Sequence, residues 1–270
     1  MRQGRGAAQD DGANSAPLSV GEDGITRLFG YETFSGSMTA LLERFSAELR
    51  TGGAHLVVTP NVDHMINLSK SGSFRSVYEK SSIRILDGMP LVRLARSLGA
   101  DSPNRLTGAD LLLACAAESA ARSWTIAVLG TMETAVAAAA QLNADYPGSA
   151  VHPVELPMLS RVADPASMKS IERLVELSPD VVFICVGSPK QENWFFEWES
   201  TLPTAMYVGA GAAVEFASGA KRRAPMWAQS AGLEWVWRVA QEPKRLLARY
   251  LVKGPKFLVL RSRSLRMRRK

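Results

Sequence analysis

Polar residues directly follow an apolar run near the middle of the chain. Residues 181–186 are unbroken in apolar character and rich in β-branched side chains, which is typical of a strand buried on both faces of a parallel sheet. Gly187 ends this run, and Gln191 is one of several polar residues in the turn that follows. Ligands of open α/β sheets bind beyond the carboxyl ends of strands, where the next helix offers free N–H groups to an anion. The pattern predicts part of a phosphate-binding turn, and an ordinary polar loop is the alternative.

A carboxylate stands in the same kind of position after another apolar run. Residues 83–86 read as a short strand, and Asp87 follows them, before Gly88 and Pro90. Pro90 suits the first turn of a helix and Gly88 permits a tight backbone turn, so Asp87 lies at a strand-to-helix junction. Side chains at such junctions meet ligands, and capping of the helix is the alternative role for Asp87.

A glycine pair, Gly209 and Gly211, follows the apolar residues 205–208 and invites a dinucleotide-binding interpretation. The third glycine of that fingerprint is Val214 here, and no acidic residue about 20 positions on ends a next strand. An NAD-dependent oxidoreductase therefore stays as a weakly supported alternative. The sequence has no P-loop, serine nucleophile elbow or metal-spaced Cys/His cluster, and it lacks the Asp-x-Asp pair that holds a divalent ion in many sugar-nucleotide enzymes. We expect no cofactor and no metal.

Strand, glycine turn and helix alternate through the middle of the chain. Apolar runs that read as strands lie at residues 55–59, 83–86, 124–130, 181–186 and 205–208. Segments with helical spacing, such as residues 37–50, separate them. This alternation predicts an α/β fold with a doubly wound, mostly parallel sheet that carries helices on both faces.

The chain divides into three regions by composition. Residues 1–20 read as a disordered leader, residues 21–220 as an α/β core of one or two lobes, and residues 221–270 as a basic helical segment. The last region carries 15 Lys or Arg and two acidic residues, a net charge of +13, whereas residues 1–220 carry −7. This asymmetry indicates an anionic partner for the tail.

Basic residues in the tail flank Trp, Tyr and Leu at helical spacing, as in a helix that lies in a membrane interface. A nucleic acid would also attract this charge, but no known nucleic-acid motif appears, so we favour an anionic membrane surface. A packed helix with an exposed basic face is a third interpretation, and a non-enzymatic basic adaptor is an alternative function. Gly254 and Pro255 are expected to end one tail helix.

The compartment is predicted from what the sequence lacks. No apolar run resembles a signal peptide or reaches the length of about 18 residues that a spanning helix needs. Cys115 and Cys185 lie apart within apolar runs and read as reduced core residues. We therefore expect a cytoplasmic protein without a spanning segment.

Taken together, these stretches resemble the WecG/TagA/CpsF glycosyltransferases, glycosyltransferase family 26. The matching segments stand in the family's order and cover about residues 35–255. They are Thr59-Pro60-Asn61, Asp87-Gly88-Met89-Pro90, Arg105-Leu106-Thr107-Gly108-Ala109-Asp110, Gly187-Ser188-Pro189-Lys190-Gln191-Glu192, Gly209-Ala210-Gly211, Lys221-Arg222-Arg223-Ala224-Pro225, Gly232-Leu233-Glu234-Trp235 and Gln241-Glu242-Pro243-Lys244-Arg245.

The resemblance implies a bacterial enzyme that moves a sugar, with inversion, from a UDP-sugar to an undecaprenyl-diphosphate-linked saccharide. The product would belong to a surface polysaccharide or cell-wall polymer, and the enzyme would be peripheral on the inner face of the plasma membrane. It implies Asp87 as the general base that takes the proton of the acceptor hydroxyl, with Thr59 and Asn61 shaping the sugar pocket beside it. Arg105 and Gln191 would meet the donor diphosphate without a metal. The donor-site segments also contain Gly187, Gly209 and Gly211.

In this family the basic C-terminal segment is thought to reach the membrane and to complete the active site. The candidates here are Arg222, Arg223, Arg238 and Arg245, among which the sequence does not choose. The leader before Leu18 and the arginine-rich run after Leu260 depart from the family pattern. The transferred sugar, the acceptor glycan and self-association are not readable from these residues.

Overall fold

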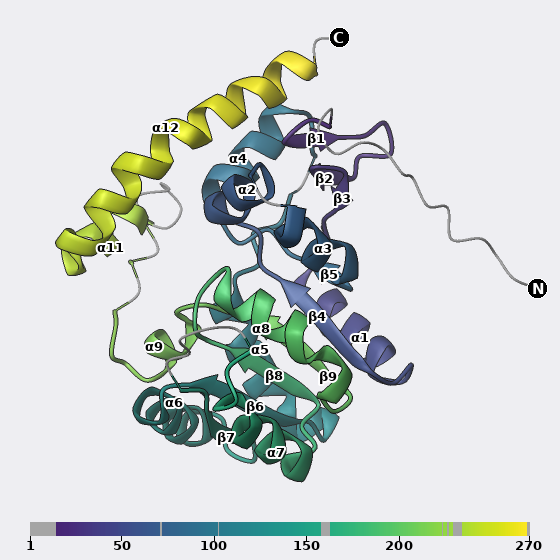
Figure 1. The fold of residues 1–270 in the computed structure, drawn as a ribbon, viewed down its shortest axis with the longest axis vertical. Helices are drawn as coiled ribbons and strands as arrows, with labels where there is room; N and C mark the ends of the chain where they lie inside the picture. The colour runs from purple at the N-terminus through teal and green to yellow at the C-terminus, as the bar shows by residue number, and fades with distance from the viewer. Residues whose placement is uncertain are drawn as a thin grey trace, which may run out of the picture.

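Six strands form the central sheet, in the order β5-β4-β9-β8-β6-β7 (Figure 1). They are β4 (Ala54–Val58), β5 (Ile83–Arg84), β6 (Thr125–Gly130), β7 (Ala150–Glu155), β8 (Val181–Ile184) and β9 (Ala205–Gly209). Every neighbouring pair is parallel, so the carboxyl ends of all six strands lie at one edge of the sheet. The expected doubly wound α/β fold is confirmed.

The protein is described from a computed structural model, which covers residues 15–70, 72–101, 103–157, 163–222, 224–225, 227–228 and 234–268. Within the last range, the side chains of residues 234, 235, 238 and 244–250 lie outside the description.

The strands alternate their side chains between two hydrophobic cores, one on each face of the sheet. In β8, Val182 and Ile184 belong to the first core, and Val181 and Phe183 to the second. All four side chains are buried, which explains why this strand reads as a continuous apolar run rather than as an alternating one. Cys115 is a buried free thiol in the second core.

Helices cover both faces of the sheet. The first core takes side chains from α2 (Val62–Leu68), α3 (Gly72–Lys80), α4 (Met89–Ser97), α7 (Ser167–Leu177) and α8 (Lys190–Trp198). The second takes them from α1 (Met38–Leu49), α5 (Gly108–Arg122), α6 (Met132–Asp145) and α9 (Ala213–Ala217). A short 3-10 turn, Glu199–Thr201, follows α8. Two layers of helices therefore enclose the sheet.

A small antiparallel sheet precedes the core. It consists of β1 (Leu18–Val20), β2 (Thr26–Leu28) and β3 (Tyr31–Glu32). The expectation of a leader that extends to residue 20 is wrong for Leu18–Val20, because Leu18 is buried in the first core and pairs with Leu28. Residues 1–14 lie outside the described residues.

The tail contains α11 (Glu234–Gln241) and the long helix α12 (Pro243–Met267), which lies along one side of the molecule in Figure 1. The prediction that a helix ends at Gly254 and Pro255 is wrong, because α12 continues through both residues. Pro255 has no N–H to give to the carbonyl of Leu251, but both residues are exposed, so water reaches the carbonyl that loses its partner.

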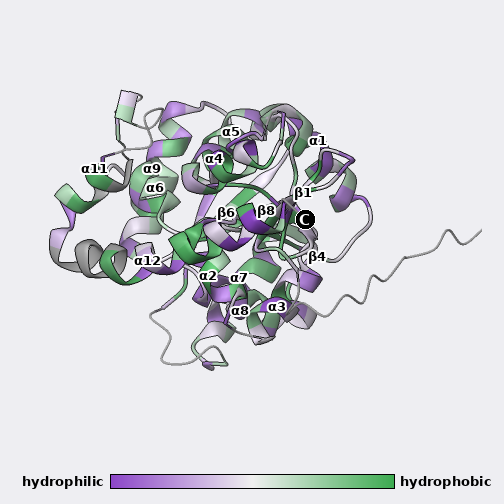
Figure 2. Cartoon of the chain, turned by 90° about the horizontal axis from the view of Figure 1, so that it is seen from above, coloured by the Kyte–Doolittle hydropathy of each residue, from purple (hydrophilic) through white to green (hydrophobic). Residues whose placement is uncertain are grey.

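The two sides of α12 differ in character. Phe257, Leu260 and Leu265 pack against the first core, and Ser264 is buried where its Oγ accepts a hydrogen bond of 2.9 Å from the N–H of Leu18. The other side carries four apolar side chains that are 57% to 69% exposed, namely Leu251, Val252, Leu258 and Val259. Figure 2 shows hydrophobic and hydrophilic stretches side by side on the α11–α12 part of the molecule.

No helix among the described residues is long and apolar enough to cross a membrane.

Candidate functional site

Four neighbouring strands bring the predicted site residues to one edge of the sheet. The order β5-β4-β9-β8 places the turns after these strands side by side. Thr59 follows β4 and its Oγ1 donates a hydrogen bond of 2.7 Å to the carbonyl oxygen of Gly209, the last residue of β9. The backbone N–H of Asp87, after β5, donates to the carbonyl oxygen of Pro60 at 3.0 Å. Hydrogen bonds therefore connect the turns after β4 and β5 with each other and with the end of β9.

Asn61 fixes the start of α2. Its side-chain Oδ1 accepts hydrogen bonds from the backbone N–H groups of Asp63, at 2.9 Å, and His64, at 3.3 Å. This is the N-cap geometry, which satisfies two donors that the first helical turn leaves over. Asn61 also lies beside Gly88, where an added Cβ would be 3.5 Å from its Cα. Asn61 is thus held next to the Asp87 turn, as the resemblance implies.

Asp87 and Arg105 lie together at the end of β5. The Nε of Arg105 donates a hydrogen bond of 2.8 Å to the backbone carbonyl of Asp87, and the next residue, Leu106, donates its N–H to Leu86 at 3.0 Å. The N-cap position of α4 belongs to Gly88, the residue after Asp87. Asp87 and Arg105 are only partly buried, so a carboxylate that can accept a proton and a guanidinium that can stabilise negative charge lie at the same strand end.

The turn after β8 is held to the turn after β9 by Gln191. Its side-chain Oε1 accepts a hydrogen bond of 3.0 Å from the N–H of Gly211, and its Nε2 donates to Glu192 Oε1 at 2.7 Å. Gln191 is 2% exposed. The carbonyl of Gly187 accepts a hydrogen bond of 3.1 Å from the N–H of Gln191. Gly187 has a φ of 82°, a left-handed conformation that glycine adopts at little steric cost.

The glycine turn after β9 is closely packed. An added Cβ at Gly209 would lie 2.6 Å from Gln191 Nε2, and one at Gly108 would lie 2.9 Å from the Cα of Ala210. Gly211 has a φ of 56°, in the left-handed region that favours glycine. The turn therefore needs glycine for close approach and for backbone conformation, which is a sufficient physical reason for the Gly209-x-Gly211 pattern without a dinucleotide.

Glu192 and His64 are fully buried beside this turn, and Glu192 was not among the predicted site residues. His64 Nδ1 lies 2.6 Å from the hydroxyl of Tyr78, and His64 Nε2 lies 3.4 Å from Glu192 Oε1. Burial lowers the pKa of His64 to about 3 and raises the pKa of Glu192 to about 7. The sequence spacing could have indicated this burial. Residues 191 and 192 lie three positions before Trp194 and Phe195, so all four residues share the buried side of α8.

The tail contacts α9, the helix that follows the glycine turn. Lys221, which follows α9, forms ion pairs of 2.6 Å with Glu215 and with Glu242, the residue before α12. The backbone carbonyl of Arg222 accepts hydrogen bonds of 3.1 Å from Trp237 Nε1 and from Gln241 Nε2.

Of the four arginine candidates in the tail, the structure describes the side chain of one. The side chain of Arg222 is exposed. Arg223 lies outside the described residues, as do the side chains of Arg238 and Arg245. Their predicted roles stay predictions.

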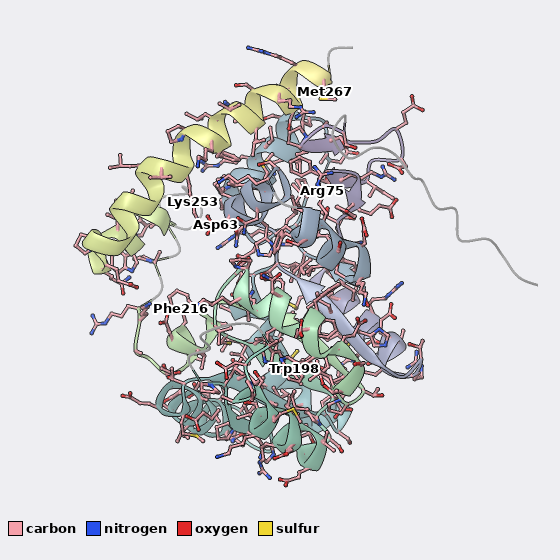
Figure 3. The ribbon with its side chains drawn as sticks, viewed as in Figure 1. Asp63, Arg75, Trp198, Phe216, Lys253 and Met267 are labelled. Atoms are coloured by element: carbon pink, nitrogen blue, oxygen red, sulfur yellow. The ribbon has the colours of Figure 1, made fainter. Side chains whose placement is uncertain are left out.

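A second ion pair joins the middle of α12 to α2. Lys253 Nζ lies 2.8 Å from Asp63 Oδ1, and Figure 3 shows the two residues on facing elements. Asp63 is 7% exposed and stands two positions after Asn61. The tail is thus attached to the β4–α2 turn that carries Thr59 and Asn61.

Within the described ranges, no three His, Cys, Asp or Glu side chains are grouped so that they could hold a metal ion. The fold and the position of the site are those of an α/β enzyme that binds its ligand beyond the carboxyl ends of the strands. The chain belongs to the glycosyl transferase WecG/TagA/CpsF family, whose model matches residues 26–270. The resemblance drawn from the motifs is confirmed, and the protein is a glycosyltransferase.

Similar curated proteins include two from Staphylococcus aureus, strains MW2 and NCTC 8325 / PS 47. Both are named N-acetylglucosaminyldiphosphoundecaprenol N-acetyl-beta-D-mannosaminyltransferase. Each is 25% identical to this chain over 191 residues, which cover 70% of the chain and 73% of the relative. Their names identify a lipid-linked acceptor for those enzymes.

Proposed function

We propose that this protein transfers a sugar from a UDP-sugar to an undecaprenyl-diphosphate-linked saccharide, with Asp87 as the general base. The observation that carries the proposal is the placement of Asp87 at the end of β5, where its backbone carbonyl accepts a hydrogen bond from Arg105 and its N–H donates to Pro60 of the Thr59–Asn61 turn. The acceptor follows from the names of the relatives, and the product would enter a surface polysaccharide or cell-wall polymer.

The proposed reaction is a single displacement with inversion at the anomeric carbon. A hydroxyl oxygen of the acceptor saccharide attacks the anomeric carbon, and its proton passes to the carboxylate of Asp87. The bond between the anomeric carbon and the diphosphate oxygen breaks, and UDP leaves with that electron pair. We place the diphosphate beside the turn of Gly209 and Gly211, where Arg105 meets its growing negative charge, so the protein itself supplies the charge stabilisation.

The acceptor's lipid places the reaction at a membrane surface, and α12 has a suitable outer side. The exposed Leu251, Val252, Leu258 and Val259 would enter the interface between lipid headgroups and acyl chains. Exposed basic residues accompany them on the same helix, namely Lys256, Arg263 and Arg266. A basic and apolar helix surface of this kind favours the cytoplasmic leaflet, which is anionic.

The catalytic part of the proposal is tested by comparing Asp87→Asn with Glu155→Gln. Glu155 is an exposed carboxylate at the end of β7, and β7 and β5 are the two outermost strands of the sheet, so it controls for the loss of one negative charge far from Asp87. We expect Asp87→Asn to lower the transfer rate by a factor of about 100 or more, while UDP affinity stays within about threefold. Equal transfer rates for Asp87→Asn and Glu155→Gln would exclude Asp87 as the base.

Donor binding is tested by calorimetric titration with UDP in the presence of anionic vesicles, with and without EDTA. We expect binding that survives EDTA and that weakens in Arg105→Ala. The absence of binding at millimolar UDP would overturn the proposed donor, and loss of binding with EDTA would overturn the metal-free site. Heat on titration with NADH would favour the oxidoreductase alternative.

Membrane association is tested by sedimentation with vesicles that contain phosphatidylglycerol. We expect Leu258→Ser with Val259→Ser to reduce the bound fraction. Val136→Ser with Val175→Ser is the control, because these residues are 46% and 53% exposed on the core helices α6 and α7. Equal loss in both double variants would contradict a specific role for α12.

A further inference from the structure

A chain of polar contacts crosses the buried space between α3 and the glycine turn. It runs from the Tyr78 hydroxyl to His64 Nδ1 at 2.6 Å, and from His64 Nε2 to Glu192 Oε1 at 3.4 Å. Gln191 Nε2 donates to the same Glu192 oxygen at 2.7 Å, and Gly211 N–H donates to Gln191 Oε1 at 3.0 Å. The four side chains are at most 2% exposed, so water does not compete for these contacts.

The protonation states give this chain one direction. Burial raises the pKa of Tyr78 and lowers that of His64 to about 3, so the phenol keeps its proton and the imidazole is neutral. The phenol then donates to Nδ1, which leaves the ring proton on Nε2. Among the described residues, Gln191 Nε2 donates to Glu192 Oε1, whereas His64 Nε2, 3.4 Å from the same oxygen, is buried without a hydrogen bond.

Two contacts fix the amide of Gln191. A reversed amide would point its NH₂ group at the N–H of Gly211 and its oxygen at the Glu192 carboxylate, so both hydrogen bonds would be lost. The orientation with Oε1 on Gly211 is therefore held by the Gly211 N–H and the Glu192 carboxylate together.

Protein stability does not explain why a glutamate occupies position 192. A buried carboxyl with one side-chain donor is costly to desolvate, and both Glu192 Oε2 and His64 Nε2 are buried without a hydrogen-bond partner among the described residues. A leucine would fill similar volume without this cost. The acid is instead placed where it orients a side chain that touches the glycine turn.

We propose that Glu192 is a positioning residue that fixes the Gln191 amide and, through it, the Gly209–Gly211 turn for the donor diphosphate. The donor part of this inference rests on the proposed function. The structural part, the restraint of the Gly211 N–H by Gln191, does not.

The first test compares Glu192→Leu with Glu192→Gln. The glutamine keeps an oxygen acceptor for Gln191, whereas leucine keeps only the volume. We expect Glu192→Leu to weaken UDP binding about tenfold in calorimetry, and Glu192→Gln to restore affinity to within about threefold of the wild type. Equal affinities in the two variants would overturn the proposal.

The second test is a double-mutant cycle with Gln191→Ala. If Glu192 acts through Gln191, Glu192→Leu should have little further effect on UDP affinity once Gln191 is alanine. A full tenfold loss in that background would show that Glu192 acts on the ligand directly and would refute the positioning role.

The third test needs no ligand. Amide hydrogen exchange of Gly211 should be about tenfold faster in Glu192→Leu than in Glu192→Gln, because the Gly211 N–H loses a fixed acceptor. Failure of the proposed donor appears as no UDP binding by the wild type, whereas failure of this inference appears as equal Gly211 exchange in both variants.

Discussion

Gly108→Ala is expected to disturb the site through one contact. Gly108 is the buried first residue of α5, and an added Cβ would lie 2.9 Å from the Cα and 3.1 Å from the Cβ of Ala210. Ala210 cannot easily retreat, because its N–H donates to the carbonyl of Ile184 in β8 at 3.0 Å. Carbon atoms prefer a separation of about 3.5–4.0 Å, so α5 or the turn must move by about 0.6 Å or more.

The expected cost of this overpacking is about 1–3 kcal/mol of unfolding free energy. For a protein of this size, each kcal/mol lowers the melting temperature by about 2–4 °C. Gly72→Ala is the matched control, because Gly72 is the exposed first residue of α3 and an added Cβ there meets no atom within 4 Å. That control should be neutral or stabilised by up to about 1 kcal/mol.

Differential scanning calorimetry gives the melting temperatures, and UDP titration gives the effect on the site. We expect Gly108→Ala to melt at a lower temperature than Gly72→Ala and to bind UDP more weakly, because the Gly209–Gly211 turn is displaced. Equal melting temperatures in the two variants would refute the close approach of α5 to this turn. A lower melting temperature with unchanged UDP affinity would refute its use in donor binding.

Two further predictions concern buried charges. Glu192 has a pKa raised to about 7 from 4.5, which makes stability fall as pH rises between these values, and His64 has a pKa lowered to about 3 from 6.5, which makes stability rise with pH between those values. In the wild type the two effects oppose each other between about pH 4.5 and 6.5. In Glu192→Gln only the effect of His64 remains, so the unfolding free energy, measured by urea denaturation, should rise over this range by up to about 1.4 kcal/mol per pH unit. An unfolding free energy that does not change with pH in this variant would contradict the lowered pKa of His64. Lys253→Met should lower the unfolding free energy by about 1–2 kcal/mol, because it removes the ion pair with the largely buried Asp63. Lys256→Met, at an exposed position of the same helix, is the control and should lower it by less than about 0.5 kcal/mol. Equal losses in the two variants would contradict a stabilising role for the Lys253–Asp63 pair.

The sheet and much of the site were predictable from the sequence, because both depend on local patterns. The apolar runs at residues 55–59, 124–130 and 181–186 became β4, β6 and β8 with shifts of one or two residues. Polar residues after such runs meet at one edge whenever the strands are parallel, so Asp87 and Thr59 were placed correctly relative to the sheet.

The remaining features depend on contacts between distant segments. The short run at residues 18–20 forms a strand because Leu18 finds Leu28 and Ser264, which no local pattern reveals. The helix through Pro255 persists because the opposite side of α12 is packed along the body. Gln191 was expected at the diphosphate, and the structure uses its amide to hold Gly211, so direct contact with a ligand stays a prediction.

The contacts of α12 change the meaning of the tail. It was expected as a basic segment distinct from the core, yet it contacts the core at three places. Lys221 pairs with Glu215 of α9, Lys253 pairs with Asp63 of α2, and Ser264 accepts a hydrogen bond from Leu18. The first contact is with α9, which follows the Gly211 turn, and the second is with α2, which begins after Asn61. Truncation of the tail would remove these supports together with the lipid-facing surface, so single substitutions on the outer side of α12 are the cleaner measure of membrane binding.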